Sequence, residues 1–479
     1  MEYIDLYNKG IDSLSEKDYL EAIRQLNKSY VLSNQRLNEA LYCLGIAYEN
    51  IGSFDDAEIH YIKYINIHKD SIKGWIHLGY LYYNNNNLLQ AVDTFKMAIE
   101  IVGVNKQLHL AITEILIKLE IFNEAEYYYE QILGEIIHDQ NNTKTYIFVL
   151  EILGKYNKAI ETLEEFLVNN KCLPRRHTAE LQCLLGFMNL KIGNYKNGFK
   201  LIENRWDTEK DAFKLGFDLS LMWNGSQQSA QCVKNKSLLL IWDQGLGDTI
   251  HFARYINSIN TKFKNIYILC QKELKRLFIS SFPGIKVFTK DDNLPKYDYF
   301  IPLMSLPFAL KLSKSNLFNE NTYIYPAYKK NRSSSAQKII GIVWSGNKDS
   351  YNYETKSINI NEIEKLINRN NKHKWISLQY GFKDKIKNLK IILNDDSDFF
   401  DMCNVISDLD LVITVDTSVA HLAGAIGAPT WIMLSKNSCW RWGWEGLTTE
   451  WYKSVRLFRQ KSFNNWNDVF NEITASLNH

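Results

Sequence analysis

Two aspartates in this chain stand at positions where α/β proteins place their chemistry. The first follows residues 411–415 (LVITV), an apolar and β-branched run with the length of a buried parallel strand. Asp416, Thr417 and Ser418 come next, and these residue types cap helix N-termini. A helix that starts at the carboxyl end of a strand presents free N–H groups and the positive end of its dipole, which suit a phosphate. This stretch therefore predicts a phosphate site or a simple helix cap, and alone it does not choose between them.

The second aspartate lies in a glycine turn. The segment DQGLGDT at residues 243–249 follows an apolar run and predicts a tight turn through Gly245 and Gly247 that opens a helix. Asp248 then falls in the first helical turn, where a carboxylate can take a proton from a hydroxyl group as a general base. A cap of the helix dipole is the alternative interpretation. An NAD site is a weak hypothesis, because Ile250 occupies the third glycine place of the dinucleotide fingerprint.

Both aspartates need parallel sheets behind them, and the second half of the chain predicts two. Apolar runs predict the strands of a first lobe at residues 238–242, 267–269, 285–287 and 299–301. Further apolar runs predict the strands of a second lobe at residues 339–344, 375–378, 411–415 and 430–434. A polar stretch at residues 329–337 predicts a linker between the lobes. Two doubly wound lobes imply a cleft that the carboxyl ends of both sets of strands face.

The first half of the chain is a repeat array. Alanines recur every 34 residues, and a large side chain follows each alanine four residues later: Ala57, Ala91, Ala125 and Ala159, with Tyr61, Phe95, Tyr129 and Leu163. A helix–turn–helix period of this length and pattern resembles the tetratricopeptide repeat. Weaker units precede and follow, so we predict six units over residues 1–205 and a transition segment over residues 206–234. Such arrays bind peptides or protein partners in an inner groove. The side chains expected there are Tyr42, Ile46, Glu49, Ile76, Tyr80 and Tyr83, and inter-repeat core is the alternative for about half of them.

Composition excludes several classes of protein. The 479 residues include 56 basic and 54 acidic side chains, and this balance gives no electrostatic case for nucleic acid or an anionic membrane. No apolar run approaches the length of a membrane span, and the charged N-terminus excludes a signal peptide. Seven scattered cysteines without a CxxC predict buried thiols, with neither disulfides nor a metal site. We therefore expect a cytoplasmic protein.

The order of five motifs makes the interpretation specific. Residues 235–470 contain, in this order, GLGDTIHFARY, IGIVWSGN, WISLQYG, DLVITVDTSVAHLAGAIGAPTWIML, and WRW with WYKSVRLFRQ. This order resembles the glycosyltransferase family 9 (heptosyltransferase-like) proteins, and more narrowly the bacterial branch with tetratricopeptide repeats in front. The resemblance implies a GT-B fold. The acceptor would bind the first lobe, residues 235–330, and a nucleotide-sugar donor the second, residues 337–479, without metal or other cofactor.

The resemblance also implies roles for individual residues. Asp248 matches the catalytic base, Asp416, Thr417 and Ser418 match the diphosphate-binding helix start, and His421 lies one turn into that helix. The departing diphosphate can be stabilised by helix N–H groups and one or two cations. The further candidates for donor binding are the glycines of the two glycine turns, two lysines, a glutamine at a strand end and an arginine among tryptophans: Gly245, Gly247, Gly346, Lys348, Lys356, Gln379 and Arg441. Lys356 stands where the family often has arginine. The lysine keeps the positive charge but cannot form the two parallel hydrogen bonds of a guanidinium.

These motifs predict a metal-independent inverting glycosyltransferase. Lipopolysaccharide heptosyltransferases work without a solenoid, so we expect a protein acceptor, modified on Ser or Thr and held by the repeats. Two alternatives stay open. One is a repeat scaffold with a relic transferase domain, and the other is a glycan-modifying enzyme whose repeats recruit a partner. The sequence does not choose among ADP-, GDP-, UDP- and CMP-linked sugars, nor among hexose, heptose and nonulosonate.

Overall fold

The computed structural model describes residues 2–208, 216–225, 233–318, 322–327, 337–350, 353–381 and 386–478. Contacts divide the chain into two compact units, Met1–Asn170 and Lys171–His479. Most of the predicted linker at residues 329–337 lies outside the described residues, as do parts of the predicted transition segment at residues 206–234. The limits predicted for the two lobes on either side of that linker stay a prediction.

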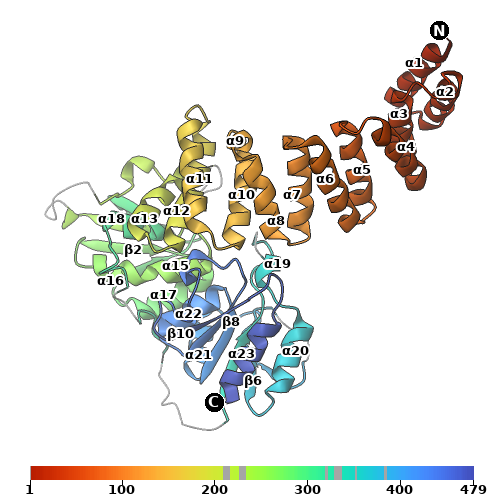
Figure 1. Cartoon of the computed structure of the whole chain (residues 1–479). Coiled ribbons are helices and arrows are strands. Elements are labelled where there is room, and N and C mark those ends of the chain that lie inside the picture. The colour runs from red at the N-terminus through yellow and green to blue at the C-terminus, as the bar shows by residue number, and fades with distance from the viewer. Residues whose placement is uncertain are drawn as a thin grey trace. The chain divides into compact units, whose positions relative to one another are not determined.

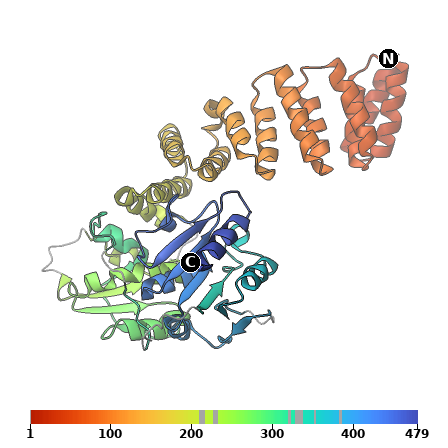
Figure 2. The ribbon, with the colours of Figure 1, turned by 60° about the horizontal axis from the view of Figure 1, so that its bottom comes forward.

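The first unit consists of five helical hairpins (Figures 1 and 2). They are formed by α1 (Glu2–Ser15) and α2 (Tyr19–Leu32), α3 (Glu39–Asn50) and α4 (Phe54–Ile67), α5 (Ile72–Asn84) and α6 (Leu88–Val102), α7 (Lys106–Lys118) and α8 (Phe122–Gln131), and α10 (Gln140–Ile152) and α11 (Tyr156–Asn169), with the short α9 (Leu133–Ile136) before the last pair.

Small residues lie where the helices of a hairpin touch. The four alanines of the repeat pattern are fully buried. A Cβ atom added to Gly45 would lie 2.4 Å from the ring of Tyr61, and one added to Gly79 would lie 2.3 Å from the ring of Phe95. The 34-residue spacing is thus the spacing of one recurring packing contact, and the predicted tetratricopeptide solenoid is confirmed.

A sixth hairpin follows in the second unit. It consists of α12 (Arg175–Lys191) and α13 (Tyr195–Ile202), and the 3-10 helix η1 (Glu203–Asp207) continues it. Phe199 and Ile202 belong to the same buried cluster as strand residues of both sheets. A cut after residue 205, where the sequence places a domain boundary, would therefore separate these side chains from the core that they share.

The first sheet has four parallel strands in the order β3-β2-β1-β4. The strands are β1 (Ser237–Ile241), β2 (Asn265–Leu269), β3 (Lys286–Phe288) and β4 (Tyr299–Pro302). Side chains of β1 alternate between two clusters, as a strand requires. Leu238 and Leu240 pack with α15 (Leu246–Phe252), α16 (Ile256–Ile259) and α17 (Lys275–Ser281), whereas Leu239 and Ile241 pack against the opposite cluster.

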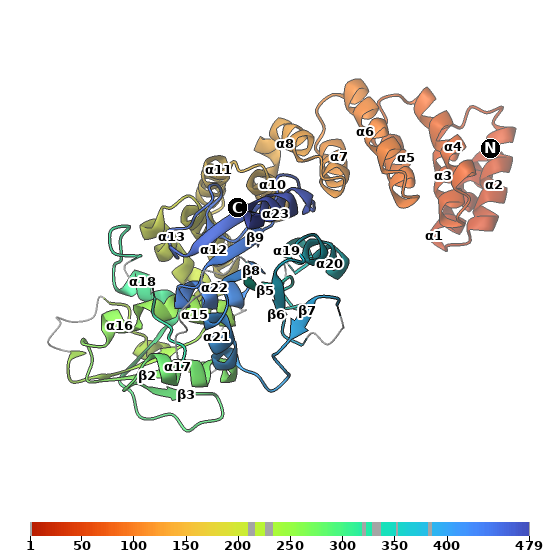
Figure 3. The same cartoon turned by 90° about the horizontal axis from the view of Figure 1, so that it is seen from below.

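The second sheet has six parallel strands in the order β10-β9-β8-β5-β6-β7 (Figure 3). They are β5 (Ile339–Val343), β6 (Lys374–Ser377), β7 (Leu389–Ile391), β8 (Leu411–Val415), β9 (Thr430–Leu434) and β10 (Val455–Arg459). Helices α20 (Ile360–Arg369) and α23 (Asn467–Asn478) pack on one face. Helices α21 (Phe399–Ser407) and α22 (Ser418–Ile426) pack on the other. Two parallel sheets covered by helices are consistent with two Rossmann-like lobes, so the predicted fold class is confirmed.

The exposure of the cysteines differs in part from the expectation. Cys172 is exposed, contrary to the prediction of uniformly buried thiols, because it lies in the short turn before α12. None of the six described cysteines forms a disulfide. In the described part of the chain, no helix has both the length and the apolar character that a membrane crossing requires.

Candidate active site

Helix α22 forms the side of the site that belongs to the second lobe. It begins directly after β8, with Thr417 as the extended N-cap residue, and no side chain caps the helix start. The Thr417 hydroxyl instead lies 3.2 Å from the hydroxyl of Thr414. The first N–H groups of a helix have no intrahelical partner, so those of α22 remain available to a ligand. The helix ends at Gly427, whose φ of 75° lies in the left-handed region.

Helix α15 opens the site from the first lobe, with Gly245 as N-cap and Asp248 in its first turn. Neither Gly245 nor Gly247 has a positive φ, so neither is required for a left-handed backbone. Gly247 is instead needed for close approach. A Cβ atom there would lie 3.0 Å from Cδ2 of His421 and 3.3 Å from Cα of Ser418. The starts of two helices, one from each lobe, are therefore in contact.

Asp248 and Arg441 form an ion pair across this junction. Arg441 belongs to the 3-10 helix η7 (Trp440–Trp442), and its guanidinium lies 4.4 Å from the ring centroid of Trp440. The Asp248 side chain is 28% exposed but that of Arg441 only 8%. Burial, the largest single effect, lowers the pKa of the Arg441 guanidinium, but the negative charge of Asp248 together with Cys439 and Asp416 raises it above its ordinary value. Nη1 donates to Cys439 Sγ at 3.1 Å, and the buried Nε has no partner among the described residues.

A buried ring cluster lies behind the ion pair. The hydroxyl of Tyr452 is 3.0 Å from Nδ1 of His421 and 3.0 Å from Nδ1 of His251. His421 also stacks on Trp442, with the ring centroids 5.0 Å apart. Burial, together with the charges of Arg254 and Arg441, holds the pKa of both histidines well below the ordinary value, so both rings are neutral. His421 is thus a packing residue of the site floor, and its predicted contact with a donor stays a prediction.

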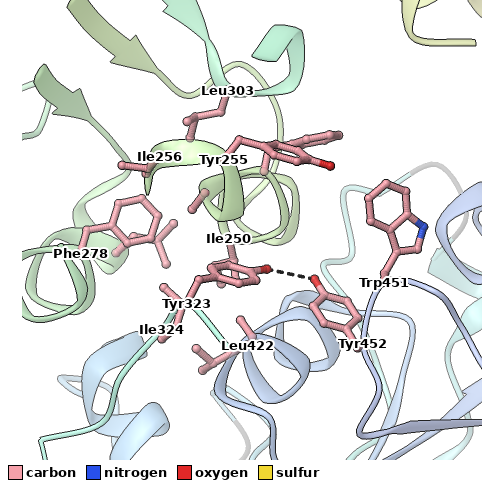
Figure 4. Close-up of a cluster of buried hydrophobic side chains, with 14 of the residues drawn as sticks. Ile250, Tyr255, Ile256, Phe278, Leu303, Tyr323, Ile324, Leu422, Trp451 and Tyr452 are labelled. Atoms are coloured by element: carbon pink, nitrogen blue, oxygen red, sulfur yellow. Dashed lines mark hydrogen bonds between the residues drawn. The ribbon is translucent and has the colours of Figure 1, made fainter. Parts of the chain in front are cut away.

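Arg254 joins the lobes beneath this cluster. Its side chain is fully buried, and it donates to the backbone oxygens of His251 at 3.0 Å and Trp451 at 3.1 Å. Its guanidinium lies within 5.1 Å of the ring centroids of Tyr323, Trp451 and Tyr452. Figure 4 shows Tyr323 and Tyr452 directed toward one another, and their hydroxyls are 3.3 Å apart. One continuous polar and aromatic core therefore fixes the position of α15 relative to α22.

The other predicted donor-binding residues, Gly346, Lys348, Lys356 and Gln379, form a second group around the glycine turn after β5. Gln379 Oε1 accepts hydrogen bonds from the N–H groups of Trp344 at 3.2 Å and Ser345 at 3.0 Å, so this side chain braces the turn. A Cβ atom added to Gly346 would lie 2.8 Å from Cε of Lys356. Lys356 and Gly346 are therefore in contact, and Lys348 is exposed nearby in the chain. That these residues meet the same ligand as Asp248 stays a prediction.

Sequence reasoning missed three buried charged residues near the site. Arg205 pairs with Asp243, and Lys191 donates to the carbonyl oxygen of Ser438. Burial is the main cause that raises the pKa of Asp243 to about 6. The negative charge of Asp248 also raises this pKa, whereas the positive charge of Arg205 lowers it. Asp243 lies within the DQGLGDT turn and could have been suspected. Nothing in the sequence pairs Arg205 or Lys191 with partners so distant along the chain.

A groove crosses the inner side of the repeats in the first unit. It has a volume of about 460 Å³ and is lined mainly by first helices of three successive hairpins. Its lining residues are Ile76, Tyr80, Gln107, Leu110, Ala111, Glu114, Ile117, Tyr129, Asn142 and Thr145. Of the six residues that the sequence analysis expects in a groove, Ile76 and Tyr80 line this one, whereas Tyr42, Ile46, Glu49 and Tyr83 are not among its lining residues. The lining combines apolar side chains with the amides of Gln107 and Asn142 and the carboxylate of Glu114, which suits both the side chains and the backbone of a polypeptide.

Among the described residues, no group of three or more His, Cys, Asp and Glu side chains is arranged to hold a metal ion. Asp410 has a structural role at the start of the second sheet. Its Oδ2 accepts a hydrogen bond from the N–H group of Ile339 at 2.7 Å, at the start of β5.

Fold and geometry together define a tetratricopeptide solenoid followed by an α/β region with two parallel sheets. No model of a known protein family matches the chain. The chain is a distant homologue of Protein FlbA of Caulobacter vibrioides, with 22% identity over 339 residues. The match covers 60% of this chain and 53% of FlbA, so the chain spans about half the length of this relative.

Solved structures show similarity to the repeats. A tetratricopeptide repeat protein from Parabacteroides merdae has 16% identity and a TM-score of 0.33, and the match covers 43% of this chain and 80% of that one. MamA has 20% identity and a TM-score of 0.30, over 36% of this chain and 93% of MamA. YrrB, described as a tetratricopeptide repeat protein with an unusual peptide-binding site, has 15% identity and a TM-score of 0.32, over 38% and 92%.

Proposed function

We propose that this chain is an inverting glycosyltransferase that moves a sugar from a nucleotide-sugar donor to a hydroxyl group of a polypeptide. The observation that carries the proposal is the junction of α15 and α22. It places a partly exposed carboxylate, a buried guanidinium and an uncapped helix start side by side. Asp248 is the base, the start of α22 binds the diphosphate, and no metal is needed.

The ion pair has a consequence for the order of events. In the free protein the Arg441 guanidinium donates to Oδ1 of Asp248, so this oxygen is not free to take a proton from a hydroxyl group. A diphosphate at the start of α22 offers Arg441 more negative charge than one carboxylate does, and the buried Nε of Arg441 is still unpartnered. Donor binding would then draw the guanidinium from Asp248. The base would become active only when a donor is present, which limits unproductive chemistry.

The transfer step itself uses few groups. Asp248 takes the proton of the acceptor hydroxyl, whose oxygen forms a bond to the anomeric carbon of the sugar. The bond from that carbon to the diphosphate oxygen breaks, and its electron pair leaves with the nucleoside diphosphate. The N–H groups at Ser418 and Val419, the helix dipole and Arg441 stabilise the charge that develops there. Lys356 is a further cation for the same role.

The groove of the repeats supports a polypeptide acceptor. Its lining combines the apolar Ile76 with the amides of Gln107 and Asn142, and these groups can contact side chains and backbone of an extended chain. YrrB, a protein of similar repeats, is described by its peptide-binding site. A glycan acceptor, with the groove recruiting a partner enzyme, is the alternative, and the donor base and sugar are left open by the residues.

Transfer assays of the purified full chain test the proposal. ADP-, GDP-, UDP- and CMP-linked sugars are offered with a cell extract as acceptor, and sugar transfer is followed by mass spectrometry. Asp248→Asn should lower the rate on the order of 10²–10⁴-fold, whereas Asp396→Asn, on an exposed loop, should leave it unchanged. An Asp248→Asn variant as active as the wild type would remove Asp248 from the role of base. An inactive wild type with every donor would favour the scaffold.

The acceptor is identified in the same assay. We expect a hexose, heptose or nonulosonate mass on Ser or Thr residues of one protein. Tyr80→Ala in the groove should reduce this transfer, and Tyr127→Ala, an exposed tyrosine that does not line the groove, serves as the matched control. Equal transfer by both variants would show that the groove does not hold the acceptor. Sugar found only on a glycan would support the alternative.

A further inference from the structure

We propose that the sixth hairpin positions both members of the Asp248–Arg441 pair, through the buried cations Arg205 and Lys191. The inference rests on the proposed function, since it assigns these two residues to the reaction that the pair performs. Both side chains are at least nine-tenths buried. A buried cation is costly unless hydrogen bonds and counter-charges surround it, so each of these two must be compensated by specific partners.

Arg205 holds the turn that carries Asp248. Its Nε and Nη2 atoms donate to Oδ2 of Asp243 at 3.1 and 2.8 Å. Nη1 pairs with Glu203 at 2.7 Å, and Nη2 also donates to the Ser305 hydroxyl at 2.7 Å. Asp243 is the second residue after β1, and the chain runs from it through the N-cap Gly245 to Asp248. The two-point contact of the guanidinium therefore fixes the start of the segment that aims the base.

Lys191 holds the turn that carries Arg441. Its ammonium donates to the carbonyl oxygen of Ser438, to the Ser438 hydroxyl at 3.3 Å and to the carbonyl oxygen of Cys439 at 3.4 Å. Cys439 is the N-cap residue of η7, and its sulfur accepts the hydrogen bond from Nη1 of Arg441. Phe199 of α13 adds an edge contact to Trp440, with centroids 5.9 Å apart. The start of η7 is thus anchored by the hairpin.

The two anchors act on opposite lobes. Arg205 contacts the turn after β1 of the first sheet, and Lys191 contacts the turn after β9 of the second sheet. Both cations belong to one continuous stretch, α12 to η1, so this hairpin sets the spacing between Asp248 and Arg441. A misplacement of about 1 Å in a reacting group can lower a rate on the order of 10²-fold. Arg205 and Lys191 are therefore positioning residues, which touch neither donor nor acceptor.

Steady-state kinetics of the full chain test the inference. Arg205→Lys keeps the positive charge but loses the paired N–H groups of the guanidinium. Lys191→Met keeps the aliphatic part of the side chain but loses the ammonium group that donates the hydrogen bonds. Each should lower kcat on the order of 10- to 100-fold, with the donor KM within about threefold of wild type. Arg175→Lys and Lys200→Met are the matched controls, because both side chains lie exposed on the same hairpin, and they should leave kcat unchanged. Where Lys191→Met does not fold, Lys191→Gln, which keeps an N–H donor, takes its place.

A double-mutant cycle separates positioning from mere support of the fold. In an Asp248→Asn background, Arg205→Lys should cause little further loss of rate, because the group that it aims is already gone. Equal losses in both backgrounds, or kcat values equal to those of the controls, would overturn the inference while leaving the proposed function intact. A wild type without transfer activity on any donor would overturn both.

Discussion

Gly247 offers a direct test of the junction between α15 and α22. A serine at this position places a Cβ atom 3.0 Å from Cδ2 of His421 and 3.3 Å from Cα of Ser418. Neither neighbour can move away freely. The His421 ring is stacked on Trp442 and bonded to Tyr452, and the Ser418 atom belongs to the backbone of α22. The substitution must therefore push the two helix starts apart.

The expected loss follows from two opposing terms. Extra atoms in a packed site cost about 1–3 kcal/mol. Replacing glycine by serine inside a helix gains roughly 0.5 kcal/mol. Gly247→Ser should thus lower the unfolding free energy by about 0.5–2.5 kcal/mol. Gly245→Ser is the matched control, because its Cβ atom would meet only Oδ2 of Asp248, at 3.6 Å. Serine is also a favourable N-cap residue, so the control should stay within about 0.5 kcal/mol of wild type.

Urea unfolding followed by tryptophan fluorescence measures this difference. The chain has twelve tryptophans, and all except Trp75 lie in the unit Lys171–His479, so the signal reports mainly on that unit. We also expect weaker binding of nucleoside diphosphates to Gly247→Ser than to Gly245→Ser. Equal unfolding midpoints for the two variants would refute the close approach of the helices and, with it, the geometry of the proposed site.

Three further predictions concern single side chains. Gly346→Ala should displace the Lys356 side chain while leaving stability nearly unchanged, because the clashing atom is the end of a flexible chain. Weaker donor binding in titration calorimetry would then support Lys356 as a ligand, and unchanged binding would exclude it. Gln379→Leu should lower the unfolding free energy by about 1–3 kcal/mol, since two backbone N–H groups lose their acceptor, and Gln379→Glu should lose less. Lys275 and the Thr289 N–H and hydroxyl groups lower the pKa of Asp292 from 3.8 to about 2. That stabilisation is present above pH 3.8 and is lost as the pH falls toward 2, so Asp292→Asn should flatten the acid limb of a stability profile.

The sequence by itself determined the features that depend on local periodicity. The alanine spacing predicts the repeats, because one hairpin repeats one packing contact. The runs at residues 411–415 and 430–434 coincide with β8 and β9, because both are mainly apolar and bounded by helix-capping and helix-stopping residues. The short strand β7 was not predicted, because two of its three side chains are exposed and leave no apolar pattern.

Only the tertiary structure decided how these elements make a site. Asp248 and Arg441 are 193 residues apart, and no spacing rule links them. Gly247 marks a contact with α22, although the sequence suggests only a turn. The sixth hairpin reads as the end of a solenoid, yet Arg205 and Lys191 lie in the core of the α/β unit. Side-chain pairing across a sheet or between lobes depends on distances that the chain sets only once it has folded, so charge partners and close approaches are invisible in the linear pattern.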